Sequence, residues 1–259
     1  MINSLQNPLV KNIVRLRKAR SRRQQDLVLI DGLREILVAF AYGFDFVQIF
    51  HCPELSLETW PEAPTEITTV SQEVFYKIAY ADNPNGWLAL VRPRYRTLAD
   101  LKLKTNPLVL VLEAVEKPGN LGAMLRTAYA AKVDAVILNN LQTDLYNPNV
   151  IKASSGHVFS DQVVIADQEE SLVWLKKNKI KIFATNIKAA SNYSLVDWRQ
   201  AAAVVMGTEA SGLSDFWIKA ADENIIIPMQ KGIDSLNVSV SAGVLMFEAR
   251  RQRDLNKKS

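Results

Sequence analysis

The chain has 259 residues, of which 48% are apolar and 22% charged, and its formal net charge is +4. This composition is typical of a globular protein with a sizeable core and argues against intrinsic disorder. No apolar run reaches the roughly 20 residues that a transmembrane helix requires. We therefore expect a protein that does not span a membrane.

The cysteine, the histidines and the N-terminal segment indicate which kinds of globular protein are excluded. The single Cys52 excludes an internal disulfide and suits a reducing compartment. His51 and His157, the two histidines, lie far apart without a set of cysteine ligands, so no metal site is predicted. The basic N-terminus lacks the apolar core and cleavage site of a signal peptide. A cytoplasmic protein without a metal is expected.

The first 95 residues have the pattern of a small α/β domain. Apolar spacing, together with glycine, proline and serine signals at the ends, predicts helices over 5–23, 33–43 and 71–80 and strands over 27–32, 45–52, 67–70 and 87–93. The stretch that follows is polar and interrupted by proline, with few apolar residues in phase. We place a linker there, over 96–106.

After the linker, the strands become apolar throughout and alternate with helices. They are predicted over 108–113, 134–140, 161–167, 181–186, 201–207 and 224–229, with a last helix over 235–253. Uninterrupted apolar strands separated by helices indicate a parallel sheet that is covered on both faces. Residues 107–259 are therefore predicted to form a second α/β domain.

A basic block is the clearest charge feature of the chain. It contains no acidic residue and consists of Lys11, Arg15, Arg17, Lys18, Arg20, Arg22 and Arg23. Such a block is often only a solvated helix face. It is also what a protein uses to neutralise the phosphates of a nucleic acid. Further arginine clusters at 92–96 and 250–253 favour a polyanionic partner.

Three strand–loop–helix junctions in the second domain combine glycine with polar side chains. Such junctions are where α/β proteins build ligand sites. In the first junction, Asn120 is expected to cap a helix, and Arg126 lies about two turns into that helix among small and apolar residues. Arg126 must reach either solvent or an anion. The spacing fits neither a P-loop nor a dinucleotide-binding loop.

The second and third junctions carry further polar residues. Gly207 closes a strand, and Glu209 follows in the loop, at the sheet edge where ligands gather, although a plain connection would look similar. In the third junction, a long helix is predicted to begin at Ser235, with Asn237 close behind. Ordinary capping explains one of these two side chains, because a helix interior gains nothing from the second.

These junctions, in their order and spacing, resemble the three motifs of the SpoU (TrmH) family of RNA ribose 2′-O-methyltransferases. The matching segments are PGNLGAMLRTA, MGTEASGLS and IPMQKGIDSLNVSVSAGVLMFEARRQR, together with YNPNVIKASSG at 146–156. The likeness covers about residues 107–253. Residues 1–95 more distantly resemble the L30e-like RNA-binding domain that many members carry in front. The resemblance implies a SPOUT-class domain with a deep trefoil knot, which the usual rule against threaded loops would not predict.

The resemblance also implies roles for single residues. The methyl donor would be S-adenosylmethionine, held mainly by the backbone of Gly207, Ile227 and Leu236, with Thr185 and Met229 as weaker candidates. The polar positions that the family uses at its catalytic site correspond to Asn120, Arg126, Glu209, Ser235 and Asn237. The chain departs from the family pattern at Lys117, where an acid is common, and at His157, where alanine is usual.

The implied activity is methyl transfer to a ribose 2′-hydroxyl of structured RNA, with 23S rRNA favoured over tRNA, by a homodimer joined through its C-terminal domain. A guanidinium group stays protonated at ordinary pH, so we expect Arg126 to stabilise the developing alkoxide and bind a phosphate rather than act as a base. Two alternatives stay open, a tRNA methyltransferase and a catalytically inactive RNA-binding factor of the same fold. An NTPase would need a Walker lysine, which the sequence lacks.

Overall fold

The computed structural model describes residues 1–208, 211–233 and 235–255. The chain divides into two compact units. The first consists of Met1–Arg94 and Asp144–Ser160, and the second of Tyr95–Thr143 and Asp161–Ser259. In the ranges given above, no helix is long and apolar enough to cross a membrane.

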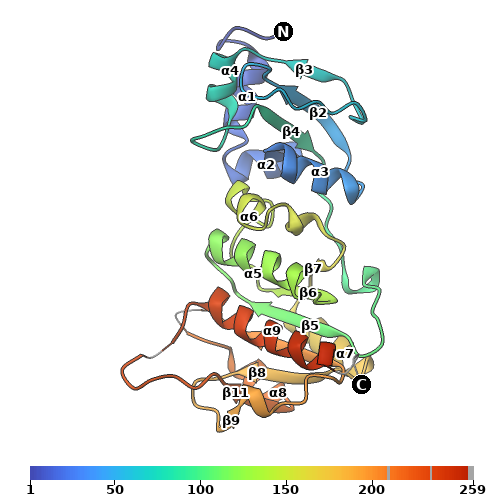
Figure 1. Cartoon of the computed structure of the whole chain (residues 1–259), viewed down its shortest axis with the longest axis vertical. Coiled ribbons are helices and arrows are strands. Elements are labelled where there is room, and N and C mark those ends of the chain that lie inside the picture. The colour runs from blue at the N-terminus through green and yellow to red at the C-terminus, as the bar shows by residue number, and fades with distance from the viewer. Residues whose placement is uncertain (209–210, 234, 256–259) are drawn as a thin grey trace. The chain divides into compact units, whose positions relative to one another are not determined.

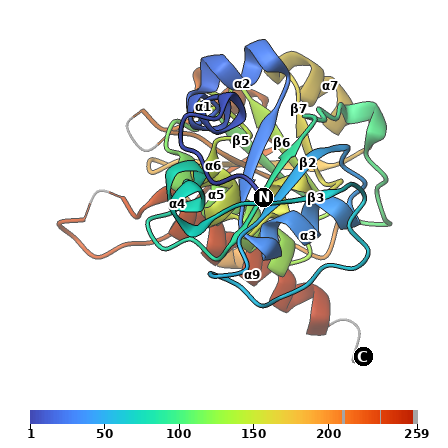
Figure 2. The ribbon, with the colours of Figure 1, turned by 90° about the horizontal axis from the view of Figure 1, so that it is seen from above.

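The first unit is built on a four-stranded sheet. Its strands are β1 (Val28–Asp31), β2 (Phe46–His51), β3 (Ile67–Thr69) and β4 (Trp87–Val91), in the order β1-β4-β2-β3. β4 is antiparallel to both β1 and β2, whereas β3 is parallel to β2. Its helices from the N-terminal part of the chain are α1 (Pro8–Arg15), α2 (Ala19–Gln25), α3 (Leu33–Ala41) and α4 (Gln72–Ile78). Helix α1 packs beside α4 (Figures 1 and 2), and the predicted small α/β fold of this part is confirmed.

The basic N-terminal segment forms two helices, so the single helix predicted over 5–23 is wrong. Helix α1 begins after Asn7, whose side-chain oxygen accepts a hydrogen bond from the N–H of Leu9 at 2.9 Å. The chain then breaks before α2, and Arg22 donates to the carbonyl oxygens of Leu16 at 2.8 Å and Arg17 at 2.9 Å. The carbonyl groups at a helix end lack partners within the helix. Arg22 donates hydrogen bonds to such carbonyl groups here and so stabilises the break between the two helices.

Residues 144–160, which the sequence assigns to the second domain, pack with the first unit. They contain helix α6 (Pro148–Ala153), which contacts β1, and the short 3₁₀ helix η2 (His157–Phe159). Arg22 Nε donates to Asp144 Oδ2 at 3.0 Å, and the ring centroids of Phe44 and Phe159 are 4.8 Å apart. A buried arginine needs a carboxylate partner, and the aromatic rings bury apolar area. The predicted boundaries therefore need correction at this segment.

The second unit is built on a parallel sheet, as predicted. In the part of the chain that the structure describes, its strands are β5 (Leu108–Glu113), β6 (Ala135–Asn139), β7 (Val163–Ile165), β8 (Lys181–Thr185), β9 (Ser191–Asn192), β10 (Ala202–Met206) and β11 (Glu223–Ile226). Their order is β7-β6-β5-β10-β8-β11-β9, and every neighbouring pair is parallel. β9, which has only two residues, was not predicted from the sequence. Strand order does not establish threading, so the trefoil knot stays a prediction.

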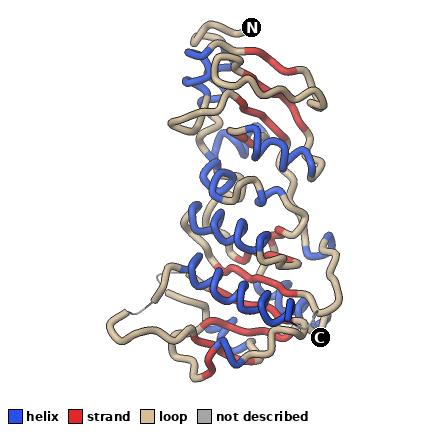
Figure 3. Tube along the Cα trace, viewed as in Figure 1, coloured by secondary structure: helices blue, strands red, loops and turns tan. Residues whose placement is uncertain are grey.

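Helices cover both faces of this sheet. On one face, α7 (Gln168–Lys177) and α8 (Asp215–Ala220) contribute Leu175 and Trp217 to a buried cluster with alternate strand residues such as Val109 and Val205. Helices α5 (Pro118–Ala130) and α9 (Val238–Leu255) pack side by side (Figure 3), and their buried residues lie outside that cluster. Because α9 also contacts β10, the helix pair covers the other face.

Candidate active site

A cavity of about 190 Å³ opens where β5 and β10 end. It is lined by Val115, Glu116, Lys117, Asn120, Gly207, Thr208 and Val238. These residues come from all three glycine-bearing junctions. β5 and β10 are adjacent and parallel, with Met206 opposite Leu112, so the loops that follow them meet at one edge of the sheet. The structure thus brings together three motifs that are far apart in the sequence.

Asn237 and Asn120 meet in front of the two helices α9 and α5. Asn237 Nδ2 donates to Asn120 Oδ1 at 3.3 Å. The other side-chain atom of Asn237, Oδ1, accepts from the backbone N–H of Ser239 at 2.9 Å and from its hydroxyl at 2.6 Å. Asn237 therefore caps α9 with its oxygen and reaches Asn120 with its nitrogen. The same side-chain amide thus both caps the helix and contacts the neighbouring motif.

The structure corrects both predicted helix starts. Helix α9 begins at Val238 and not at Ser235, because Asn237 provides the cap. Helix α5 begins at Pro118, a residue suited to the first helical position, so Lys117 occupies the cap position and makes no side-chain capping bond. Asn120 is consequently the third residue of the helix and not its cap. Its side chain does not cap the helix and lies against the cavity.

Gly207 is required by close packing of the loop that follows β10. A Cβ at this position would overlap the backbone of Gly212 and Leu213. The loop folds back so that Thr208 and Gly212 exchange two backbone hydrogen bonds of 3.1 Å each. Gly207 keeps its own backbone in the cavity wall. Glu209, the predicted carboxylate of this loop, lies outside the described residues.

Glu113, the last residue of β5, was not predicted as a site residue. Its side chain is only 5% exposed, and its carboxylate accepts from the N–H of Ser214 at 2.8 Å and from the Ser214 hydroxyl at 2.7 Å. Ser214 precedes α8 in the cap position but makes no capping bond of its own. The buried carboxylate therefore ties the loop that carries Gly207 to the end of β5. A charged residue at the end of an otherwise apolar strand is the sequence pattern that could have predicted this role.

Arg126 lies on α5 outside the cavity lining. Its side chain is exposed, and within the described ranges no residue forms a hydrogen bond or an ion pair with it. Six residues separate it from Asn120, which corresponds to about 9 Å along a helix axis. Arg126 is therefore available to an anion that comes from outside this chain. It does not contribute to the lining of the cavity.

The residues expected to hold a donor lie along one edge of the sheet. Thr185 ends β8 and its hydroxyl donates to the carbonyl oxygen of Val205 at 3.1 Å. Gly207 follows β10, and Ile227 and Met229 follow β11, both half-buried. β10, β8 and β11 are neighbours in the sheet, which brings their ends together. Ser235 and Leu236 are exposed and directly precede Asn237. Of this group, Gly207 lines the cavity itself.

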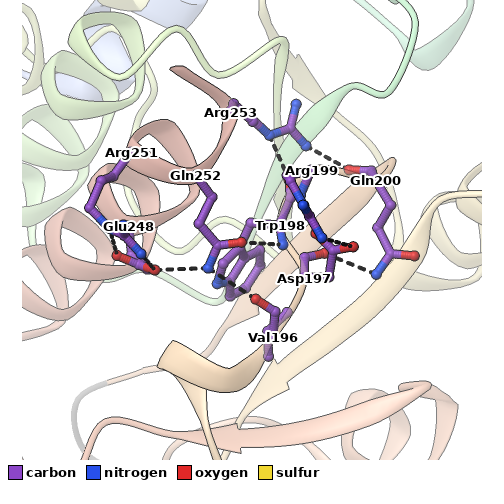
Figure 4. Close-up of polar contacts among 9 residues, drawn as sticks. All are labelled: Val196, Asp197, Trp198, Arg199, Gln200, Glu248, Arg251, Gln252 and Arg253. Carbon is purple, nitrogen blue, oxygen red and sulfur yellow. Dashed lines mark hydrogen bonds and ion pairs between the residues drawn. The ribbon is translucent and has the colours of Figure 1, made fainter. Parts of the chain in front are cut away.

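The end of α9 is fastened to the loop before β10 (Figure 4). Gln252 Oε1 accepts from the N–H of Trp198 at 3.0 Å, and Gln252 Nε2 donates to the carbonyl oxygen of Val196 at 3.1 Å. Arg253 donates to the carbonyl oxygens of Trp198 at 2.8 Å and Gln200 at 2.7 Å. Burial lowers the pKa of the Arg253 guanidinium, which still remains protonated at ordinary pH. These bonds fix the helix that Asn237 opens.

The predicted RNA-binding residues of the first unit do not form one set. Arg22 is 4% exposed and its guanidinium is engaged with Asp144 and two carbonyl groups, so it is a structural residue. Arg17 is exposed but donates to the carbonyl oxygens of Lys77, at 2.9 Å, and Ala79. The remaining exposed members are Lys11, Arg15, Lys18, Arg20 and Arg23.

Metal ligands are not gathered at this site. Among the residues that the structure describes, no group of three or more histidine, cysteine, aspartate or glutamate side chains could hold a metal ion. The cavity instead combines backbone at Gly207, the amide of Asn120, the Thr208 side chain and the apolar Val115 and Val238. This mixture suits an organic ligand that has both polar and apolar parts.

Two family sequence models match most of the chain. The model of the SpoU rRNA Methylase family matches residues 107–247, and that of the MRM3-like substrate binding domain matches residues 7–89. The first match spans more than half of the chain and includes all three junctions that form the cavity. The chain therefore belongs to the SpoU rRNA Methylase family.

Individual relatives agree with this assignment over nearly the whole length. The crystal structure of an RNA 2′-O ribose methyltransferase is 39% identical, with a TM-score of 0.84, covering 97% of this chain and 98% of that one. An AdoMet-bound rRNA methyltransferase from Sinorhizobium meliloti is 27% identical, with a TM-score of 0.86 and coverage of 96% and 97%. The 23S rRNA (guanosine(2553)-2′-O)-methyltransferase RlmP of Bacillus subtilis is 26% identical over 96% of this chain and 98% of its own.

Proposed function

We propose that this protein transfers a methyl group from S-adenosylmethionine to a ribose 2′-hydroxyl of ribosomal RNA, with 23S rRNA as the preferred substrate. The observation that carries the proposal is the meeting of the three motifs at one edge of the parallel sheet, where Asn120, Gly207 and Val238 line a single cavity. The named activity of RlmP on 23S rRNA and the donor bound to the Sinorhizobium meliloti enzyme support it.

The residues at this edge fit the donor. Backbone at Gly207, Ile227 and Leu236 would hold it, with Thr185 and Met229 beside them, since β10, β8 and β11 end together. The close packing of Gly207 on Gly212 keeps its backbone in the cavity wall. When bound, the donor supplies an electrophilic methyl group on a sulfonium. The chain has to align this group with the hydroxyl and exclude competing water.

Alignment and charge stabilisation account for the chemistry of the protein itself. Holding the hydroxyl in line with the methyl group contributes at best roughly 7–11 kcal/mol. Asn120 and Asn237, which are bonded to each other, with Ser235 beside them, are assigned to positioning the ribose. Arg126 stays protonated, so it stabilises the developing alkoxide and binds an adjacent phosphate. An RNA phosphate takes the proton.

A homodimer joined through the second unit is part of this proposal. Val240 and Phe247 on α9 are 52% and 50% exposed, and Val244 lies between them on the same stripe of the helix. The buried residues of α9, such as Ala242 and Leu245, face the other way. An exposed apolar stripe suits a contact with a second copy. Because α5 packs beside α9, Arg126 would lie close to that contact.

The first unit is proposed to bind the RNA. Its exposed basic residues on α1 and α2 and the match to a substrate binding domain support this role. We assign the L30e-like domain to residues 1–95, with residues 144–160 added to it, the linker to 96–106 and the methyltransferase domain to the remainder up to 259. Ribosomal RNA is preferred over transfer RNA because RlmP spans the same two parts. The cytoplasm, where such RNA is made in bacteria, is the proposed location.

Incubation with labelled S-adenosylmethionine and separated RNA classes tests this function. We expect label in large-subunit rRNA taken from a strain that lacks the gene, at one ribose that is unmodified there and modified in the parent strain. Label in tRNA alone would replace the substrate assignment. Absence of label in every RNA class, with RNA binding retained, would favour the inactive binding factor.

A further inference from the structure

Tyr76 is a large aromatic residue on the outer side of α4, in the first unit. Its side chain is 53% exposed and forms no hydrogen bond or ring contact with any residue that the structure describes. The inner side of the helix consists of Val74, Phe75 and Ile78, which are buried in one core cluster. The core therefore does not include Tyr76, and its ring is open to a ligand.

Arg17 lies at the C-terminal end of the same helix. Its Nη2 donates to the carbonyl oxygen of Lys77, the residue next to Tyr76, at 2.9 Å, and to that of Ala79. Both bonds use one nitrogen of a guanidinium group that carries five N–H donors. The side chain is exposed, and within the described part of the chain nothing bonds to its Nε or Nη1. Arg17 is thus fixed in position and still has donors for an anion.

Further positive charge lies on the helix that packs beside α4 (Figures 1 and 2), which is α1. It carries Lys11 and Arg15, which are exposed and form no hydrogen bond or ion pair with the residues described above. The acidic residue of α4, Glu73, lies in its first turn, at the end away from Arg17. This corner of the first unit therefore attracts an anionic ligand.

An open aromatic ring beside such cations indicates the class of ligand. Bases of RNA that have no pairing partner stack on aromatic side chains, while the phosphates of the same strand bind arginine and lysine. Bases inside a double helix are already stacked on one another, so they offer no face to a ring. Arg17 makes no ring contact with Tyr76, so the guanidinium does not take the place of a base.

We propose that Tyr76 and Arg17 form a site for one unpaired nucleotide of the RNA, with its base stacked on the Tyr76 ring and its phosphate bound to Arg17. This inference rests on the proposed RNA-binding role of the first unit. Stacking accepts any base, so the site distinguishes unpaired from paired RNA rather than one sequence from another. It directs the first unit to a loop or bulge of the folded rRNA.

The experiment compares three RNA probes: a single strand, a duplex of the same length, and an abasic strand that keeps only the sugar–phosphate backbone. The dissociation constant for each probe is measured on the full-length protein as a function of salt. The variants are Tyr76→Ala and Tyr76→Phe, with Leu37→Ala, at a position of α3 that is 40% exposed, as the control. Thermal unfolding confirms that each variant is folded. The KM and kcat for large-subunit rRNA are measured on the same preparations.

We expect Tyr76→Ala to weaken binding of the single strand about tenfold, the size of one base–aromatic stack, with an unchanged salt slope because no charge is lost. Binding of the duplex and of the abasic strand should stay at the parent level, and the KM for rRNA should rise with little change in kcat. Tyr76→Phe keeps the ring, so it should match the parent protein, as should Leu37→Ala. An equal loss on all three probes, or no loss on any, would overturn the stacking role.

The phosphate contact is tested with Arg17→Gln against Arg17→Lys, which keeps the charge. For the single strand we expect the slope of log K against log salt to fall by about 0.7 in Arg17→Gln, the loss of one phosphate contact, and to stay unchanged in Arg17→Lys. Thermal unfolding reports the loss of the bonds to α4 separately. A parent-like slope in Arg17→Gln would overturn the assignment of the phosphate.

The binding measurements need no turnover, so the site and the proposed function can fail separately. A parent protein that binds the probes but labels no rRNA fails the proposed methyl transfer, while the comparison of probes still decides the site at Tyr76. A parent protein that labels rRNA but binds the single strand no better than the abasic strand retains the function and loses the site.

Discussion

Glu113 and Ser214 are 101 residues apart in the sequence and share two hydrogen bonds, of 2.8 and 2.7 Å, between the carboxylate and the backbone N–H and hydroxyl of the serine. The carboxylate is buried at the end of β5, and the serine directly precedes α8. This pair holds the loop after β10 in place, so the geometry of the cavity depends on a residue that does not line it.

Glu113→Gln should therefore weaken the fold and the donor site together. Glutamine keeps one acceptor oxygen and presents an N–H in place of the other, so one of the two Ser214 donors loses its acceptor, at a cost of about 1–3 kcal/mol. We expect a lower midpoint of urea unfolding and a weaker donor affinity by calorimetry. Glu170→Gln, at an exposed position on α7, is the control and should change neither. A midpoint of urea unfolding equal to that of the parent protein would show that the bonds between Glu113 and Ser214 do not stabilise the fold.

The two tasks of Asn237 can be separated by substitution. Asn237→Asp keeps an oxygen that caps α9 but loses the amide nitrogen that donates to Asn120, so stability should be retained while kcat falls at least tenfold. Asn237→Ala loses the cap as well and should cost about 0.5–2 kcal/mol of unfolding free energy in addition. Single-turnover rates and denaturant unfolding measure the two effects. A fully active Asn237→Asp protein would remove the contact with Asn120 from the mechanism.

Gly207→Ala should disrupt the loop after β10. The added Cβ overlaps the backbone of Gly212, which cannot move aside as a flexible side chain would. We expect a loss of stability of about 1–3 kcal/mol, as for other overpacked positions, and a strong loss of donor binding. Gly119→Ala is a suitable control because a Cβ there meets nothing within 4 Å and alanine favours a helix. Equal stability of the two variants would contradict the close approach.

Arg126→Ala should abolish turnover while leaving donor binding largely intact. The guanidinium lies outside the cavity and has no partner within the described residues, so its removal leaves the donor positions unchanged. Calorimetric titration with S-adenosylmethionine and methyl incorporation into rRNA are measured on the same preparation. Lys132→Ala, just beyond the end of α5, serves as the control. Loss of donor binding in the Arg126 variant would refute the assignment.

The stability of the first unit and the reactivity of its buried thiol, Cys52, should depend on pH. Burial, and then the hydrogen bond that its thiol donates to Glu54, raise the pKa of Cys52 from 9.0 to about 11. The unfolded chain releases this proton first, so the contribution of the thiol to stability is fully present below pH 9 and is lost as the pH rises through 11. At pH 9, iodoacetamide should modify the folded protein at least tenfold more slowly than the urea-unfolded protein. Equal rates would show an accessible, ordinary thiol.

The class of fold and most of the local chemistry follow from the amino-acid sequence. Apolar strands that alternate with helices predict a parallel sheet covered on both faces, because the signal lies in the spacing of neighbouring residues. The three motifs predicted which residues gather at the carboxyl edge, and Asn120 and Gly207 do line one cavity there. These features follow from short-range patterns and from the rule that parallel strands end at a common edge.

Contacts between distant segments were decided by the tertiary structure alone. The pairing of Glu113 with Ser214 and the burial of Arg22 against Asp144 link residues more than 100 positions apart, and no local pattern encodes such a distance. The same holds for residues 144–160, which pack with the first unit although they lie between two strands of the second. Helix α9 begins at Val238 and not at the predicted Ser235, because the cap is Asn237, whose side chain also contacts Asn120. A buried charge is stable only where the folded chain brings a partner to it, and that is a property of the whole structure.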